Sequence, residues 1–210
     1  MAAVAVVRST GTDVFAMRFQ LGPPPANPAF DPTAGGWIKL KEPNPWLMQL
    51  LALPIAVGVG VLLMWAMTRL VDLRPSGIVP ILVVLLLLLP VHEMIHALIH
   101  PGNGRTIDSI VGFWPKKLVC YAHYDGPLSR NRFIAVLIGP FLVMSVVPLL
   151  VEAMLRVNFT WVAVLAIVNG LAASGDTAAC LLLLQAPRTA TMRNQGYYTW
   201  WRPAAPDRPT

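Results

Sequence analysis

The sequence predicts an all-α membrane protein with four transmembrane helices and a short β-hairpin in the central cytoplasmic loop. Of the 210 residues, 56% are hydrophobic and 12% are charged, whereas soluble domains contain about 25% charged residues. The mean hydropathy is +0.61. Four apolar runs also have the length of roughly 20 residues that a hydrocarbon core requires. These observations exclude an ordinary soluble domain.

The N-terminal segment, residues 1–46, precedes any span. Its residues 4–7 and 14–19 are rich in β-formers, which predicts two short strands. Residues 21–45 are rich in Pro and Gly, which predicts an extended linker on the surface. This composition is compatible with a small ordered cap and equally with a disordered tail.

A four-span membrane domain is predicted over residues 47–185. The sequence Pro-Ser-Gly at residues 75–77 turns the chain after the first span, and Pro-Gly-Asn-Gly at residues 101–104 ends the second. Pro and Gly at these places interrupt helices. The predicted spans are residues 47–70, 78–100, 133–155 and 159–184.

The longest loop between spans is expected to contain the hairpin. Residues 106–114 and 118–124 are rich in β-formers and flank Pro115-Lys116-Lys117, a pattern typical of two strands joined by a turn. After the last span, residues 186–210 are predicted to be a basic cytoplasmic tail. Aromatic residues cluster in this tail as they do at membrane interfaces.

The charge pattern predicts the orientation of the chain in the cell membrane. Thirteen of the sixteen Lys and Arg residues lie in the N-terminal segment, the central loop and the tail, and three lie on the opposite side. The positive-inside rule therefore places both termini and the central loop in the cytoplasm of this multi-pass protein. Because the basic residues are scattered between apolar runs, the net charge of +6 indicates membrane topology rather than a nucleic-acid partner.

The pattern His-Glu-x-x-His occurs inside the second predicted span, at His92, Glu93 and His96. Positions i and i+4 share one face of a helix, so the two imidazoles can bind one Zn²⁺ while Glu93 acts as general base on the water. Ionisable groups inside a span are costly and are rare without a function. The alternative is a pair of neutral, hydrogen-bonded histidines beside a protonated structural carboxyl group.

A third ligand is expected from the fourth span. The second and fourth spans run in the same direction. At a rise of 1.5 Å per residue, His92 lies about 21 Å and Asp176 about 25 Å from the start of its own span. The two residues therefore lie at a similar depth in the membrane. Asp176 is therefore the first candidate, and it would leave the fourth zinc position open for water. His123 and His100 are the second and third candidates. Asp176 could instead form a structural hydrogen bond with Asn169 or Ser174.

Two other residues of the fourth span share the face of Asp176. Asn169 lies about two turns before it, which makes Asn169 a candidate catalytic residue, beside Glu93, that hydrogen-bonds the substrate backbone or the oxyanion. Cys180 lies four residues after Asp176. It is a possible soft ligand, but a small packing residue is the favoured interpretation.

Further motifs accompany the His-Glu-x-x-His motif in its span. They are Leu128-Ser129-Arg130-Asn131-Arg132-Phe133, Gly139-Pro140, and Asn169 followed by Ser174-Gly175-Asp176. Over residues 85–195 the chain thereby resembles a bacterial membrane family of uncharacterised domains described as putative zincin peptidases. More distantly, it is similar to site-two proteases, which are intramembrane metalloproteases. The resemblance implies that His92, His96 and Asp176 bind zinc and that Glu93 is the base.

The chain departs from site-two proteases at two places. Those enzymes usually show Asn-x-x-Pro and Asp-Gly near the third ligand, whereas here Asn169 is followed by Gly-Leu-Ala and Asp176 by Thr177. The chain also has no PDZ-like insertion.

The leading hypothesis is a membrane-embedded zinc peptidase that cleaves membrane proteins or membrane-associated peptides near the cytoplasmic face. The hairpin would pair with an unwound substrate segment by strand addition. A first alternative is a non-catalytic metal-binding membrane adaptor. A second is a small transporter with a proton or ion path, but residues 85–89 and 162–167 offer no polar continuation to the outer face.

Overall fold

The computed structural model describes residues 17–70, 75–157 and 159–203. Its contacts divide the chain into two compact units. The helical unit comprises Asn44–His96 and Leu137–Cys180, and the sheet unit comprises the described parts of Met1–Pro43, Ala97–Val136 and Leu181–Thr210. The strand predicted at residues 4–7 and the first half of the one at 14–19 lie outside the described residues, and the end of the second falls in the strand Arg18–Leu21.

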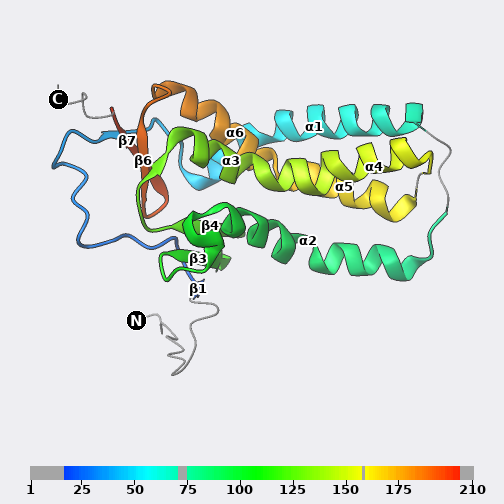
Figure 1. The fold of residues 1–210 in the computed structure, drawn as a ribbon, viewed down its shortest axis with the longest axis horizontal. Helices are drawn as coiled ribbons and strands as arrows, with labels where there is room; N and C mark the ends of the chain where they lie inside the picture. The colour runs from blue at the N-terminus through cyan, green and yellow to red at the C-terminus, as the bar shows by residue number, and fades with distance from the viewer. Residues whose placement is uncertain (1–16, 71–74, 158, 204–210) are drawn as a thin grey trace. The chain divides into compact units, whose positions relative to one another are not determined.

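The described chain is mostly helical, and its long helices coincide with the apolar runs (Figure 1). Among the described residues, Pro45–Arg69, Ile78–Ile99 and Arg130–Leu155 are each long and apolar enough to cross a membrane. The helices are α1 (Pro45–Leu70), α2 (Ile78–Ile99), α3 (Arg130–Phe141), the π-helical segment η3 (Leu142–Val146), α4 (Val147–Leu155), α5 (Thr160–Ala172) and α6 (Ser174–Leu182).

The last apolar run differs from the straight span predicted over residues 159–184. It is a pair of helices, Thr160–Ala172 and Ser174–Gln185, with an angle of 40° between them. The described chain has a fourth candidate span only if these two helices together form a single span. The break falls at Ala173, whose backbone has φ −73° and ψ 0°. Gly170, Ser174 and Gly175 surround this break, and Gly and Ser have weak helix propensities that favour an interruption here.

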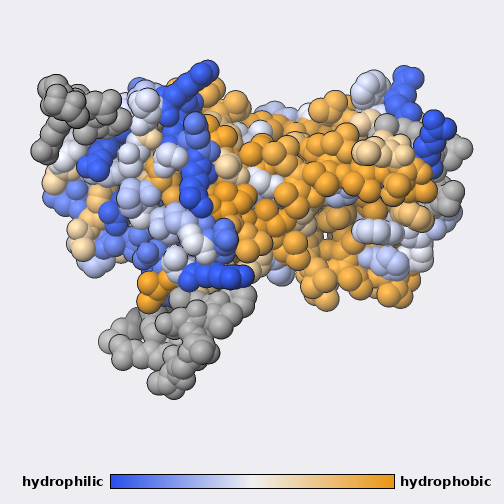
Figure 2. All heavy atoms as spheres, in the orientation of Figure 1, coloured by the Kyte–Doolittle hydropathy of each residue, from blue (hydrophilic) through white to orange (hydrophobic). Residues whose placement is uncertain are grey.

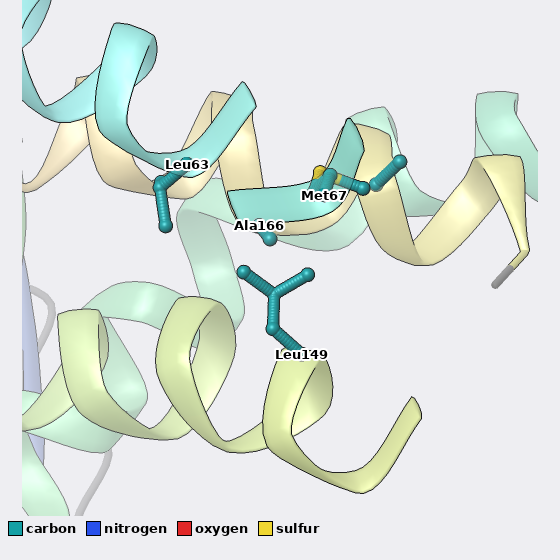
Figure 3. Packing of buried hydrophobic residues seen from close by; sticks show 5 residues of the cluster. Leu63, Met67, Leu149 and Ala166 are labelled. Carbon is teal, nitrogen blue, oxygen red and sulfur yellow. The ribbon is translucent and has the colours of Figure 1, made fainter. Parts of the chain in front are cut away.

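The core of the helical unit forms where α1, α4 and α5 pack together (Figure 3). Leu63 and Met67 of α1 and Leu149 of α4 are buried against Ala163 and Ala166 of α5. Small residues on α5 let the neighbouring backbones approach closely, which is how helices associate when no water surrounds them.

Outside this core, the helical unit exposes large apolar side chains. Leu86 is 75% exposed and Val61 is 65% exposed, and residues coloured as hydrophobic cover most of the visible face of these helices (Figure 2). A soluble monomer rarely exposes a contiguous apolar patch of this extent. The surface is therefore suited to an apolar solvent.

The sheet unit contains more β-structure than the two N-terminal strands and the central hairpin expected from the sequence. Within the described residues, one sheet has the order β1-β3-β4 and the other β2-β7-β6-β5. Strands β3 and β4 are antiparallel and joined at Pro115–Lys117, while β1 is parallel to β3. The strands are β1 (Arg18–Leu21), β2 (Ile38–Lys39), β3 (Ser109–Trp114), β4 (Val119–Tyr124), β5 (Leu128–Ser129), β6 (Thr191–Gln195) and β7 (Tyr198–Arg202).

Two of the additional strands lie in residues 186–210, which the sequence predicts to be a basic tail. Strands β6 and β7 form an antiparallel pair within residues 186–210, because β-forming Thr, Tyr and Trp residues flank a turn. Gly196 adopts φ +60° in that turn, a backbone conformation that glycine reaches at little cost. The aromatic cluster read from the sequence as an interface anchor is thus part of a sheet.

Replacing Gly170 of α5 with Val is expected to destabilise the helical unit. A Cβ atom at Gly170 would lie 2.6 Å from Leu63 Cδ1 and 3.0 Å from Val59 Cγ1, so these side chains or the helix α1 that bears them would have to shift. We expect the free energy of unfolding in detergent to fall by about 1–3 kcal/mol. Gly58→Val on α1 is the matched control, because a Cβ there meets nothing within 4 Å. Equal stability of the two variants would contradict the α1–α5 packing described.

Candidate metal centre

Helix α2 brings the two motif histidines together on one buried face. The centroids of the His92 and His96 rings lie 4.8 Å apart, with an angle of 75° between the ring planes. The two side chains are 3% and 5% exposed, respectively. This arrangement follows from the i, i+4 spacing of the motif.

Asp176 lies in the first turn of α6 and faces both histidines. Its Oδ2 atom is 3.1 Å from His92 Nε2 and 3.4 Å from His96 Nε2. The helix restarts at Ser174, after the break, so the carboxylate occupies an N-terminal turn, where the helix dipole favours negative charge. One candidate ligand atom from each of the three residues lies within 4.8 Å of the others.

These three residues fit zinc by chemistry and by spacing. Histidine nitrogen and carboxylate oxygen are common zinc ligands at about 2.0–2.2 Å, and two such ligands in a tetrahedral arrangement are about 3.3 Å apart. The Nε2–Oδ2 distances of 3.1 and 3.4 Å agree with that value. A set of three protein ligands is also the number that catalytic zinc sites use.

Glu93 is buried beside the three candidate metal ligands, and one of its carboxyl oxygens lacks a hydrogen-bond partner among the described residues. The side chain is 7% exposed, and its Oε2 atom has no hydrogen-bond partner within the part of the chain that the structure describes. Glu93 also interacts electrostatically with His92, His96 and Asp176. A buried carboxyl oxygen without a partner costs free energy, so its position points to a role in chemistry rather than in packing.

Asn169 lies in the site, but its contacts differ from those expected of a substrate-binding residue. It is 0% exposed, and its Oδ1 atom lies 2.8 Å from His92 Nδ1. Its Nδ2 atom donates hydrogen bonds to the Pro140 carbonyl at 3.0 Å and to Ser145 Oγ at 2.9 Å. The Oδ1 and Nδ2 atoms of Asn169 therefore have protein partners in this structure, and its expected contact with the substrate or oxyanion stays a prediction.

The other candidate ligands lie outside the metal group. His100 Nδ1 is 3.2 Å from Ser109 Oγ, and His123 is buried in β4; both belong to the sheet unit. Cys180 is a half-buried free thiol. Among the described residues, the group that could hold a metal consists of His92, His96 and Asp176.

Sequence reasoning missed Pro140 and Ser145 as neighbours of the site. Ser145 lies in the π-helical segment η3, is 0% exposed and donates a hydrogen bond to the Ala166 carbonyl at 2.8 Å. A lone serine in an apolar run gives no sequence signal for such a contact. For Pro140 a signal was available, because the Gly139-Pro140 pair is among the residues that carry the family resemblance.

Comparisons with known proteins agree with this chemistry. Residues 85–191 match the model of a family described as "Putative zincin peptidase". No curated protein and no solved structure matches the chain.

Purified protein is expected to bind about one zinc ion per chain and to lose it in His96→Ala and Asp176→Ala, because each change removes a ligand atom. His100→Ala and His123→Ala are the controls and should retain the metal. Metal content measured by mass spectrometry on detergent-purified protein checks this result. Zinc retained in Asp176→Ala but lost in either control would move the third ligand to that histidine.

The sheet unit is expected to lose stability at acid pH because of His123. Burial lowers the pKa of His123 to about 4, although the nearby Asp125 carboxylate opposes this shift. Between that value and about 6.5 the unfolded chain binds the proton and the folded chain does not, so stability falls as the pH is lowered through this window. From pH 7 to pH 5 the loss should be about 2 kcal/mol.

Hydrogen exchange of the β3 and β4 amides at pH 7 and pH 5 measures this effect after correction for intrinsic exchange rates. His123→Gln should reduce the pH dependence. Equal protection of these amides at both pH values in the unmodified protein would show that buried His123 becomes protonated without cost.

Proposed function

The chain belongs to the family described as putative zincin peptidases, whose model covers half of it, and from that membership we propose a membrane-embedded zinc metallopeptidase. The observation that carries the proposal is the convergence of His92 Nε2, His96 Nε2 and Asp176 Oδ2. The buried carboxyl group of Glu93 follows His92 directly in α2.

The apolar helices cross the cell membrane in this proposal, and the bent pair α5–α6 serves as the fourth span. The exposed apolar side chains of the helical unit support it, since lipid is the solvent that tolerates them. The distribution of Lys and Arg supports cytoplasmic termini and a cytoplasmic central loop. Residues 1–46 and 186–210 then flank a membrane domain over residues 47–185.

Zinc bound by His92, His96 and Asp176 would polarise a peptide carbonyl and lower the pKa of a water molecule to about 7. The two histidines contribute neutral nitrogen lone pairs, and Asp176 contributes a negative charge. Glu93 accepts the proton of the attacking water on its carboxylate and later delivers it to the nitrogen of the leaving amine. The unpartnered Oε2 of Glu93 is suited to this transfer.

The substrate class is a peptide bond in a membrane protein or a membrane-associated protein, near the cytoplasmic face. His96 lies in the last turn of α2, so the metal group is close to one end of this span. A helical substrate keeps its carbonyl groups hydrogen-bonded, so the cleaved segment must be extended. Strand β4 lies at an edge of its sheet, and a strand edge pairs with extended peptide segments by strand addition.

Glu93→Gln is expected to retain zinc and to lower peptide hydrolysis by at least about 10²-fold, because the amide cannot accept the proton. Glu152→Gln is the matched control. Glu152 is also a buried carboxylate of the helical unit, and it accepts a hydrogen bond from the Phe159 backbone. The measurement is N-terminal peptide profiling of membranes from cells that express each form, beside the metal content of each purified protein.

The profiling distinguishes the peptidase from the adaptor. Cleavage products present with the unmodified protein and with Glu152→Gln, but lost with Glu93→Gln, support the peptidase. Unchanged cellular function of a zinc-loaded Glu93→Gln protein would instead assign the chain to metal-binding adaptors.

A further inference from the structure

We propose that Asn169 and Ser145 act as positioning residues that fix the tautomer of His92, so that its Nε2 atom presents a lone pair to the metal. The inference rests on the proposed function only through the metal group. The observation behind it is a chain of hydrogen bonds that runs from α5 and η3 to α2 and has one consistent direction.

The orientation of the Asn169 amide follows from its contact with Pro140. A backbone carbonyl oxygen only accepts hydrogen bonds, so the Asn169 atom 3.0 Å from the Pro140 oxygen must be the amide nitrogen. The amide oxygen then faces His92 Nδ1 at 2.8 Å. Because this oxygen has no proton to give, His92 Nδ1 carries the hydrogen and donates it.

The hydrogen bonds of Ser145 require the same orientation of the Asn169 amide. The Ala166 carbonyl can only accept, so the Ser145 hydroxyl hydrogen is used in the 2.8 Å bond to it. Ser145 Oγ is then the acceptor for the second hydrogen of the Asn169 amide, at 2.9 Å. A flipped amide would lose both of these bonds and would place two oxygens opposite each other at Pro140.

The consequence for His92 appears at its other ring nitrogen. In neutral imidazole only one nitrogen carries a proton, so Nε2 is bare and its lone pair faces Asp176 Oδ2 at 3.1 Å. Two acceptors at that distance repel each other unless a positive charge binds both. Zinc supplies that charge, and its ligands have this spacing.

The relay of hydrogen bonds from Ser145 through Asn169 to His92 excludes the other neutral tautomer of His92. Without Asn169, His92 could carry its proton on Nε2 and donate it to Asp176, which would close the site with an ordinary hydrogen bond. Asn169 and Ser145 are both 0% exposed, so water cannot replace the partners they provide, and hydrogen bonds are stronger in such surroundings. The tautomer is therefore set before the metal arrives.

The third span supplies two of the partners, one from its backbone and one from a side chain. Pro140 lies at the end of α3, and Ser145 lies within the π-helical segment η3 that follows. Segments of π-helix occur often at functional sites. Here the segment and the residues just before it provide both a carbonyl and a hydroxyl group to one side chain of α5.

The test compares two substitutions of Asn169 by zinc affinity, measured by chelator competition on the full-length protein in detergent. Asn169→Leu removes both the acceptor and the donors at similar volume. Asn169→Asp, when protonated, still accepts from His92 and donates to Pro140. We expect Asn169→Leu to weaken zinc binding by about 10–100-fold and Asn169→Asp to weaken it less. A packing role would predict the reverse order, because Leu is apolar and the site is buried.

Ser109→Ala is the matched control. It removes a hydroxyl that lies near Nδ1 of another buried histidine, His100, outside the metal group, and it should leave zinc affinity unchanged. Zinc affinity of Asn169→Leu equal to that of the unmodified protein would overturn the proposal.

A second readout needs no metal and no Asn169 variant. Nitrogen-15 NMR of histidine-labelled, metal-free protein distinguishes protonated from bare ring nitrogens, and His92→Gln identifies the signals of His92 among the four histidines. We expect Nδ1 protonated and Nε2 bare. A proton on Nε2 alone would overturn the relay even if zinc binds. If the unmodified protein binds no zinc, the peptidase fails, and this spectrum still decides the tautomer.

Discussion

The constraint on which the structure depends is the placement of two histidine nitrogens opposite one carboxylate oxygen inside an apolar helical unit. His92 Nε2 and His96 Nε2 both face Asp176 Oδ2, at 3.1 and 3.4 Å. Burial makes unpaired polar groups expensive, so such an arrangement persists only where a cation or a proton compensates it. The spacing matches zinc ligands, and the unpartnered oxygen of Glu93 beside them suits proton transfer.

The surrounding fold provides the elements that this arrangement requires. The break at Ala173 places Asp176 in the first turn of a new helix, and Ser145 of the π-helical segment η3 contacts Asn169. The close approach of α1 at Gly170 packs the helix that bears Asn169. Three helical segments thus support the orientation of one histidine ring, which is the function expected of groups around a metal ligand.

Much of the site could be predicted from short-range patterns, and the part that could not depends on long-range contacts. The i, i+4 spacing predicts that His92 and His96 share a face. The similar depth estimated for Asp176 in the fourth span predicts that Asp176 lies near them. The protein partners of the Asn169 amide could not be predicted, because depth in the membrane and helix face do not reveal which groups an amide meets. Strands β6 and β7 were missed because composition alone does not distinguish an aromatic strand from an interface anchor.

By itself the sequence determined the apolar helices and the His-Glu-x-x-His face of α2, and it predicted a carboxylate from a distant helix as third ligand. The helices and the shared face of the two histidines follow from local periodicity and from the length of each apolar run. Both properties depend only on residues that are close together along the chain. Only the tertiary structure decided the bend before Asp176, the partners of Asn169 and hence which nitrogen of His92 carries the proton. Hydrogen-bond direction depends on donors and acceptors from helices far apart in sequence, and no local pattern records which of them meet.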